Sequence, residues 1–349
     1  MSYARSAAPL VAVVLLFGYA ACIRAATSKS VVVQSVSIDE PERPNATPET
    51  NILPEAQFAA FLSTARRLQA ERPSHLVRLD RFLEDAAAPG TVVLDTRSKS
   101  AFDAIHLAGA INVEFADLSA ESVAAVVPSK DTRVLIYCNN NFEITEEAAI
   151  AELGAKILAH ALNIPTHTTL ARLGYDNVGE LSEFVAVDDS RLSWEGVRAT
   201  NLDLVRSSHF GPRSVRLPDG QSPIGPVVPP VPARPKVVPA LVDFDKFVRE
   251  AERAVETNLF SDIGGPVADV VRFDPRSDVA FAAVPDGDAV HVNFSDFTES
   301  KLRTALPSTA TPILVVNTDA GGITALGPLT VLTLRGYGYE SVSLARSTE

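Results

Sequence analysis

Cysteine is scarce in this chain of 349 residues, since only Cys22 and Cys138 are present. Residues 1–25 have the layout of an export signal, so the remaining chain would keep one thiol and could form no internal disulfide. The Cys and His residues also lack the clustered spacing of zinc ligands. The sequence therefore predicts neither a metal centre nor another cofactor.

Clusters of basic residues are absent as well. Lys and Arg together number 31 against 43 Asp and Glu, which gives a net charge of −12. Binding to a phosphate backbone requires a cationic surface, so nucleic acid is excluded as a partner. The acidity itself describes solubility and does not indicate a function.

Long apolar runs are missing except near the N-terminus. A basic residue precedes the apolar stretch 9–17, which is too short to span a bilayer stably and is typical of an export signal. Three outcomes remain open: cleavage after Ala25, lipidation at Cys22, and an uncleaved anchor. The expected location is periplasmic or secreted, with a lipid anchor at Cys22 as the alternative to a soluble product.

Composition divides the rest of the chain into two folded parts. Residues 26–52 are polar and interrupted by prolines, which predicts a flexible spacer, and 207–239 are rich in Pro and Gly, which predicts a linker. Apolar residues at helical spacing predict an amphipathic helix over 54–71, with its apolar stripe in the core. The predicted domains are 53–206 and 240–349.

The two parts repeat each other. Residues 94–98 recur as 273–277, and 110–118 recur as 289–297, both with an offset of 179 residues and no gap. This pattern indicates a duplicated domain. Short apolar strands alternate with helical segments in each copy, which predicts an α/β fold with a mainly parallel sheet flanked by helices.

Cys138 is the strongest candidate for chemistry. It follows an apolar run that predicts a buried strand, and sites in parallel sheets form where strands end. The residues after it are Asn139, Asn140, Asn141 and Phe142. The Asn amides either donate hydrogen bonds to the sulfur or serve as turn formers, and a following helix would favour the thiolate.

Three motifs together resemble the rhodanese (sulfurtransferase) family. They are Asp95 and Arg97 in a charged turn, His106 in a His-x-x-Gly-Ala segment, and Cys138 at a strand end. The resemblance covers residues 75–187 strongly and 240–345 weakly. It implies that Cys138 accepts a sulfane sulfur as a persulfide and passes it to a thiophilic acceptor.

The other motif residues have structural interpretations. Asp95 and Arg97 recur as Asp274 and Arg276 in the second copy, so we expect them to hold the turn together by hydrogen bonds and an ion pair. His106 is expected to be a packed histidine that supports the site or lines its rim. These three residues of the first copy are therefore predicted to support the site rather than to react.

The chain also departs from the family pattern. Residues 139–147 contain no arginine and three carboxylates, which disfavours phosphatase, arsenate reductase and efficient thiosulfate chemistry. A small-molecule or protein persulfide donor and a thiol acceptor are the expected partners. The second copy has Asn317 in place of Cys138, which indicates a degenerate domain. The alternative function is a catalytically silent binding or redox-sensing protein.

Overall fold

The computed structural model describes residues 54–142, 161–199, 239–256, 270–316, 318 and 323–345. These residues belong to one compact unit, Asn51–Glu349. The predicted export signal, Cys22, the spacer and all of the predicted linker except Pro239 lie outside the described residues. No helix in the described segments is both long enough and apolar enough to cross a membrane.

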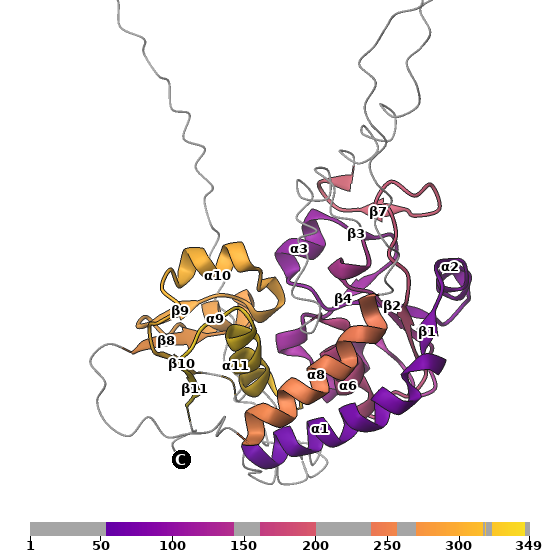
Figure 1. Cartoon of the computed structure of the whole chain (residues 1–349). Helices are drawn as coiled ribbons and strands as arrows, with labels where there is room; N and C mark the ends of the chain where they lie inside the picture. Colours follow the sequence, from indigo (N-terminus) through magenta and orange to yellow (C-terminus); the bar gives the residue numbers. More distant parts are fainter. Residues whose placement is uncertain are drawn as a thin grey trace, which may run out of the picture. The chain divides into compact units, whose positions relative to one another are not determined.

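The first half of the chain builds a five-stranded sheet in the order β1-β6-β5-β2-β4, and every neighbouring pair is parallel (Figure 1). The strands are β1 (Leu76–Val77), β2 (Val92–Asp95), β4 (Ile111–Asn112), β5 (Val134–Ile136) and β6 (Val178–Leu181). Every residue of β2, β5 and β6 is buried. Strands covered on both faces can be apolar throughout, which explains the uninterrupted apolar runs in the sequence.

Helices connect these strands, because a parallel pair needs a long crossover. The connecting helices are α2 (Leu79–Ala87), α3 (Lys99–Ala104), α4 (Ala120–Val126) and α6 (Asn163–Arg172), and α1 (Pro54–Glu71) precedes the first strand. Short 3₁₀ turns are η1 (Arg72–Ser74), η2 (Phe115–Asp117) and η3 (Asn139–Asn141), and β3 (His106–Leu107) pairs antiparallel with β7 (Trp194–Glu195). The helix predicted over 54–71 is confirmed, and its apolar stripe is buried.

The second half repeats the design with one strand fewer. Its parallel sheet has the order β11-β10-β8-β9, which matches β6-β5-β2-β4 of the first sheet. The strands are β8 (Val271–Asp274), β9 (Ala289–His291), β10 (Ile313–Val315) and β11 (Val342–Leu344). The helices are α8 (Pro239–Glu256), α9 (Asp278–Ala283), α10 (Glu299–Ala305) and α11 (Leu326–Gly336), with the 3₁₀ turn η5 (Phe294–Asp296). The predicted α/β fold with two parallel sheets is confirmed.

A repeated Gly-Tyr pair ends the corresponding helices α6 and α11. Gly174 and Gly338 have φ values of 80° and 88°, a conformation that glycine adopts without steric cost. The tyrosines that follow are buried, and their hydroxyls reach backbone carbonyls: Tyr175 donates to Val127, and Tyr339 donates to Leu302 and Leu306. The repeat is therefore a helix ending, not a binding motif.

One apolar cluster runs through both halves of the chain. It includes Ile136 of the first sheet and Phe273 of the second, and Phe115 and Phe294 meet within it at 5.4 Å between ring centroids. Helices α1 and α8 also pack against each other, with Phe61 and Phe247 in edge contact at 6.4 Å. The two halves thus share a core, which a pair of independent domains on a linker would not have.

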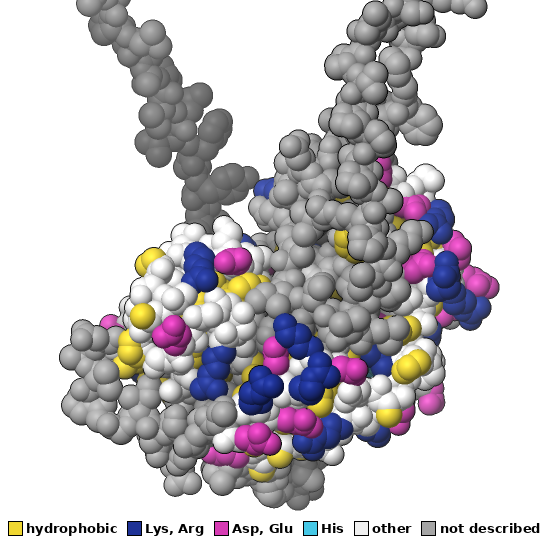
Figure 2. Space-filling model, viewed as in Figure 1, with side chains coloured by type: hydrophobic (Ala, Val, Ile, Leu, Met, Phe, Trp, Pro, Cys, Tyr) yellow, Lys and Arg dark blue, Asp and Glu magenta, His cyan; other side chains and the backbone are white. Residues whose placement is uncertain are grey.

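The surface over these two helices carries both signs of charge. Figure 2 shows basic and acidic side chains next to one another on this face. One example is the exposed ion pair between Arg66 of α1 and Glu252 of α8, whose charged atoms are 2.7 Å apart. Exposed pairs of this kind contribute little to stability.

Candidate active site

Cys138 is the second residue beyond β5, the central strand of the first sheet. Its thiol is free, and the residue is 2% exposed. Alternate residues of a strand face opposite sides, so the Cys138 side chain joins Ile136 in the shared cluster, whereas Tyr137 faces the second cluster behind the sheet. The sulfur therefore lies on the face of the sheet that α6 covers.

The 3₁₀ turn η3 fixes the backbone that follows the cysteine. The backbone N–H of Cys138 donates to Oδ1 of Asn141 at 2.8 Å. Nδ2 of Asn141 in turn donates to the carbonyls of Leu181 and Glu183, at 2.7 and 3.2 Å. Both amide protons of Asn141 are thus used by the backbone beyond β6. The side-chain amide of Asn141 therefore acts as a turn former.

The buried ion pair of Asp95 and Arg97 lies beside this turn, at the carboxyl end of β2. Nη2 of Arg97 is 2.6 Å from Oδ2 of Asp95, and Nε reaches both carboxylate oxygens at 3.0 Å. Burial by itself raises the pKa of Asp95, but the charge and hydrogen bonds of Arg97 outweigh it and hold that pKa below its ordinary value. The pair is therefore ionised and electrically neutral as a unit.

Arg97 also connects the charged turn to the cysteine. Its Nη1 donates to Oδ1 of Asn139 at 3.2 Å, and its Nη2 donates to the carbonyl of Ile105 at 2.6 Å. The hydroxyl of Tyr137 donates to Asp95 at 2.5 Å, so both residues next to Cys138 are tied to the ion pair. The sequence separation of 42 residues between Arg97 and Asn139 hid this contact from pattern analysis.

His106 follows Ile105 in the chain, and its side chain packs against α3. Its ring stacks on Phe102 with centroids 3.6 Å apart, and its Nδ1 is 2.7 Å from the Phe102 carbonyl. Nε2 lies 3.5 Å from a carboxylate oxygen of Glu195, its partner across the β3–β7 pair. These contacts fasten the small antiparallel sheet to α3.

Sequence analysis missed a second buried charge cluster on the face of the sheet that holds Cys138. Glu180 of β6 lies opposite Ile136 of β5 and contacts Arg72 at 2.7 Å, Nδ1 of His167 at 2.7 Å and Nδ2 of Asn163 at 3.0 Å. Burial raises the pKa of Glu180, but Arg72 and His167 reverse this effect and lower it to about 2. An acidic residue within an otherwise apolar strand was the feature of the sequence that could have indicated this cluster.

Several predicted features cannot be placed. Residues 143–147, which carry the three carboxylates, and Asn317 lie outside the described residues. Within the described part of the chain, no group of three or more His, Cys, Asp and Glu side chains is arranged to hold a metal ion.

The second half keeps the charged turn. Nη2 of Arg276 is 2.7 Å from Oδ2 of Asp274, and Nε reaches both carboxylate oxygens at 3.1 Å. The same bonds thus form in the copy that has no cysteine at the position of Cys138. The ion pair is a feature of the fold that each copy retains.

The family description "Rhodanese-like domain" matches residues 78–183. No curated protein matches the sequence. Among solved structures, the chain is similar to a thiosulfate sulfurtransferase from Pseudomonas aeruginosa, at 17% identity and a TM-score of 0.41, with 82% of this chain and 46% of that chain covered.

Two further structures are similar at lower scores. The 3-mercaptopyruvate sulfotransferase SseA from Escherichia coli shares 17% identity, with 79% of this chain and 99% of that chain covered and a TM-score of 0.24. The anaerobic ergothioneine biosynthesis enzyme from Chlorobium limicola shares 12% identity, with 77% and 58% covered and a TM-score of 0.26. The family match identifies residues 78–183, within the half of the chain that carries Cys138, as a rhodanese-like domain.

Proposed function

We propose that this protein is a sulfurtransferase whose nucleophile is Cys138. The observation that carries the proposal is the position of a free thiol at the carboxyl end of the central strand of a rhodanese-like domain. A turn with fixed geometry follows it, and Arg97 binds the first residue of that turn. Such an arrangement holds a sulfur nucleophile in one orientation.

The proposed reaction has two steps. The Cys138 thiolate attacks the outer sulfur of a donor persulfide, R–S–S⁻, so that a new S–S bond forms and the donor leaves as the thiolate R–S⁻. An acceptor thiolate then attacks the outer sulfur of the Cys138 persulfide and leaves as a new persulfide, which restores the Cys138 thiolate. No external oxidant or reductant is needed, because the sulfane sulfur keeps its oxidation state throughout.

The charges around the turn favour a donor with little negative charge. Arg97 is the cation that binds Asn139, and its charge is already balanced by Asp95. Residues 143–147 add carboxylates in sequence and no arginine. A dianion such as thiosulfate would therefore gain little attraction, so a low-molecular-weight persulfide or a protein persulfide is the proposed donor and a thiol the acceptor.

The proposed location is outside the cytoplasm. It rests on the export-signal pattern of residues 1–25, and Cys22 is the candidate site of a lipid anchor. The test is to express the full chain and to measure the N-terminal mass and the membrane association of the mature product. A product that retains residues 1–25 in the cytoplasm would contradict this part of the proposal.

The chemical proposal is tested by intact mass of the full chain in a Cys22→Ser background. We expect a mass gain of one sulfur atom after incubation with a persulfide donor, its removal by cyanide or by a thiol, and a smaller gain with thiosulfate. The matched control is the further substitution Cys138→Ser, which should abolish the gain. An absence of any sulfur adduct on an accessible Cys138 would overturn the proposal.

The burial of the cysteine favours a second candidate function. Cys138 is 2% exposed, as a structural or redox-sensing thiol would be. If this alternative holds, iodoacetamide should label Cys138 only after a denaturant is added or after an oxidation step opens the turn. Labelling of the native protein at a rate that rises with pH would instead support the reactive thiolate.

A further inference from the structure

The two halves of the chain meet through equivalent residues. Nδ2 of Asn293 donates to Oε2 of Glu114 at 2.7 Å, and these residues are separated by the repeat offset of 179. The rings of Phe115 and Phe294, separated by the same offset, also face each other. Contacts between equivalent residues are the property of a twofold interface, so the halves are related by a pseudo-twofold axis near Glu114.

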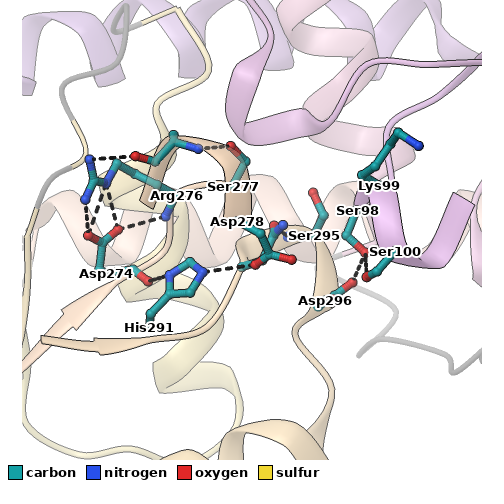
Figure 3. Close-up of polar contacts among 12 residues, drawn as sticks. Ser98, Lys99, Ser100, Asp274, Arg276, Ser277, Asp278, His291, Ser295 and Asp296 are labelled. Carbon is teal, nitrogen blue, oxygen red and sulfur yellow. Dashed lines mark hydrogen bonds and ion pairs between the residues drawn. The ribbon is translucent and has the colours of Figure 1, made fainter. Parts of the chain in front are cut away.

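A crossed pair of hydrogen bonds supports this symmetry. Ser98, the N-cap of α3, donates to Asp296, while Ser277, the N-cap of α9, donates to Asp117 at 2.8 Å. The repeat offset converts one bond into the other. Figure 3 shows Ser98 and Asp296 side by side, and Ser277 apart from them, next to Arg276. Each half thus binds the charged turn of the other.

The two bonds are equivalent, but their surroundings are not. Oγ of Ser295 donates to the carbonyl of Thr96 at 3.2 Å, whereas Ala116, the equivalent of Ser295, has no hydroxyl for the reverse bond. Oε1 of Glu114 also accepts the backbone N–H of Lys99 at 2.6 Å, so Asn293 binds a carboxylate that itself holds this turn. The charged turn of the cysteine-bearing half, residues 95–99, is therefore held by more bonds than the equivalent turn of the second half.

That turn contains Arg97. The contacts from the second half hold Thr96 and Ser98, the residues on each side of Arg97, and Arg97 binds Asn139 next to Cys138. We propose that Asn293, Ser295 and Asp296 of the second half are positioning residues for the Cys138 turn. The degenerate copy would then act on the chemistry without supplying a reacting group. The proposal rests on the proposed role of Cys138 as a nucleophile.

The physical basis is the precision that nucleophilic attack requires. A displacement of about 1 Å in a positioned group costs up to roughly 100-fold in rate. Arg97 is 1% exposed and is held by Asp95, so it cannot adjust independently if the turn moves. A shift of the turn would therefore be passed to Asn139, and through it to Cys138.

The experiment compares Asp296→Ala with its pseudo-symmetric counterpart Asp117→Ala, in the full chain with Cys22→Ser. Both variants remove an acceptor from an N-cap serine at the same interface, but Asp117 faces the turn of the half without the cysteine. Two properties are measured: the rate and pH midpoint of Cys138 alkylation by iodoacetamide, and the rate of sulfur loading from a persulfide donor.

We expect Asp296→Ala to lower the rate of sulfur loading about tenfold and to shift the alkylation pH midpoint, with Asp117→Ala close to wild type. Asp296→Asn should restore both properties, because its side-chain oxygen can still accept from Ser98. Its ion pair with Lys301 is lost, but Lys301 is exposed. Ser295→Ala is a second variant, which we expect to fold because the first copy has Ala116 at the equivalent position. It should lower the rate of sulfur loading and shift the alkylation midpoint less than Asp296→Ala does.

Equal effects of Asp296→Ala and Asp117→Ala, or no effect of Asp296→Ala and Ser295→Ala on either property, would overturn the positioning role. The alkylation measurement needs no sulfur donor and therefore separates the two proposals. A changed alkylation profile in a protein that never accepts sulfur would support the positioning role and reject the sulfurtransferase. Normal sulfur loading together with an unchanged alkylation profile in Asp296→Ala and Ser295→Ala would support the sulfurtransferase and reject the positioning role.

Discussion

Glu114 and Asn293 stand at the same place in the two repeats and bind each other across the pseudo-twofold axis, with 2.7 Å between the carboxylate oxygen and the amide nitrogen. A symmetric pair of two glutamates would bring two carboxylates together there. Burial already raises the pKa of Glu114 above its ordinary value, so the charged form is disfavoured in the folded state. Because the second repeat has Asn293 at this position, a neutral amide faces Glu114, and the interface is compatible with a charged Glu114.

Replacing Asn293 with glutamate should therefore destabilise the protein at neutral pH. We expect Asn293→Glu to lower the free energy of unfolding by about 2 kcal/mol at pH 7. A carboxyl whose folded-state pKa is raised costs stability above that pKa, so the loss should shrink as the pH falls from 7 to 5 and the pair takes up a proton. Urea unfolding at both pH values provides the measurement. Asn293→Ala is the control, and equal stability of the two variants at pH 7 would contradict the expectation.

The Glu180 cluster should support stability only above moderately acidic pH. The pKa of Glu180 is about 2, lower than the ordinary value of 4.5. The contribution of Glu180 to the free energy of unfolding is therefore complete above about pH 4.5 and is lost as the pH falls toward 2. Glu180→Gln removes the carboxylate charge from the buried ion pair with Arg72, and we expect a loss of about 3–5 kcal/mol in unfolding free energy at pH 7. The difference from wild type should narrow between pH 5 and 2 in denaturant titrations.

An exposed pair serves as the control for that experiment. Glu252→Gln breaks the ion pair with Arg66, and we expect a loss within about 1 kcal/mol, because both side chains are solvated. A Glu180→Gln variant that loses no more than this control would show that the buried cluster adds nothing to stability.

Asn141 should determine the stability of the turn after the cysteine. Asn141→Ala leaves the Cys138 N–H and the Leu181 carbonyl without their partner, and we expect a loss of about 2 kcal/mol in unfolding free energy. Asn141→Asp keeps the acceptor for Cys138 but places a carboxylate oxygen against two carbonyls. It should be at least as unstable at pH 7 and should recover part of the loss at pH 4, where it is protonated. Thermal melts at both pH values provide the measurement. A melting temperature of Asn141→Asp equal to that of wild type at pH 7 would contradict the expectation.

Arg97 should be irreplaceable by lysine in the first half. Its guanidinium binds Asp95, Ile105 and Asn139 at once, and a single ammonium group cannot reproduce this fork. We expect Arg97→Lys to lower the rate of sulfur loading about tenfold. Arg276→Lys disrupts the equivalent ion pair in the second half and should leave that rate unchanged. Equal rates in the two variants would show that the arginine acts only through stability.

Much of the fold could be predicted because it depends on patterns of residues that are close together in the sequence. Apolar runs indicate β2 and β5, helical spacing indicates α1, and the constant offset between 94–98 and 273–277 shows that one topology was used twice. The position of Cys138 at the end of a buried strand follows from the same patterns. Each of these inferences depends on residues close together in the chain.

The tertiary structure alone decided which distant groups meet. Arg72 and Glu180 are separated by 108 residues, and Ser98 and Asp296 by 198. Periodicity reports which side of an element is buried, but it does not encode which element lies opposite. The sheet order and the pseudo-twofold packing of the two halves bring these side chains together, because most buried polar groups need a hydrogen-bond partner and the fold determines which partner is near.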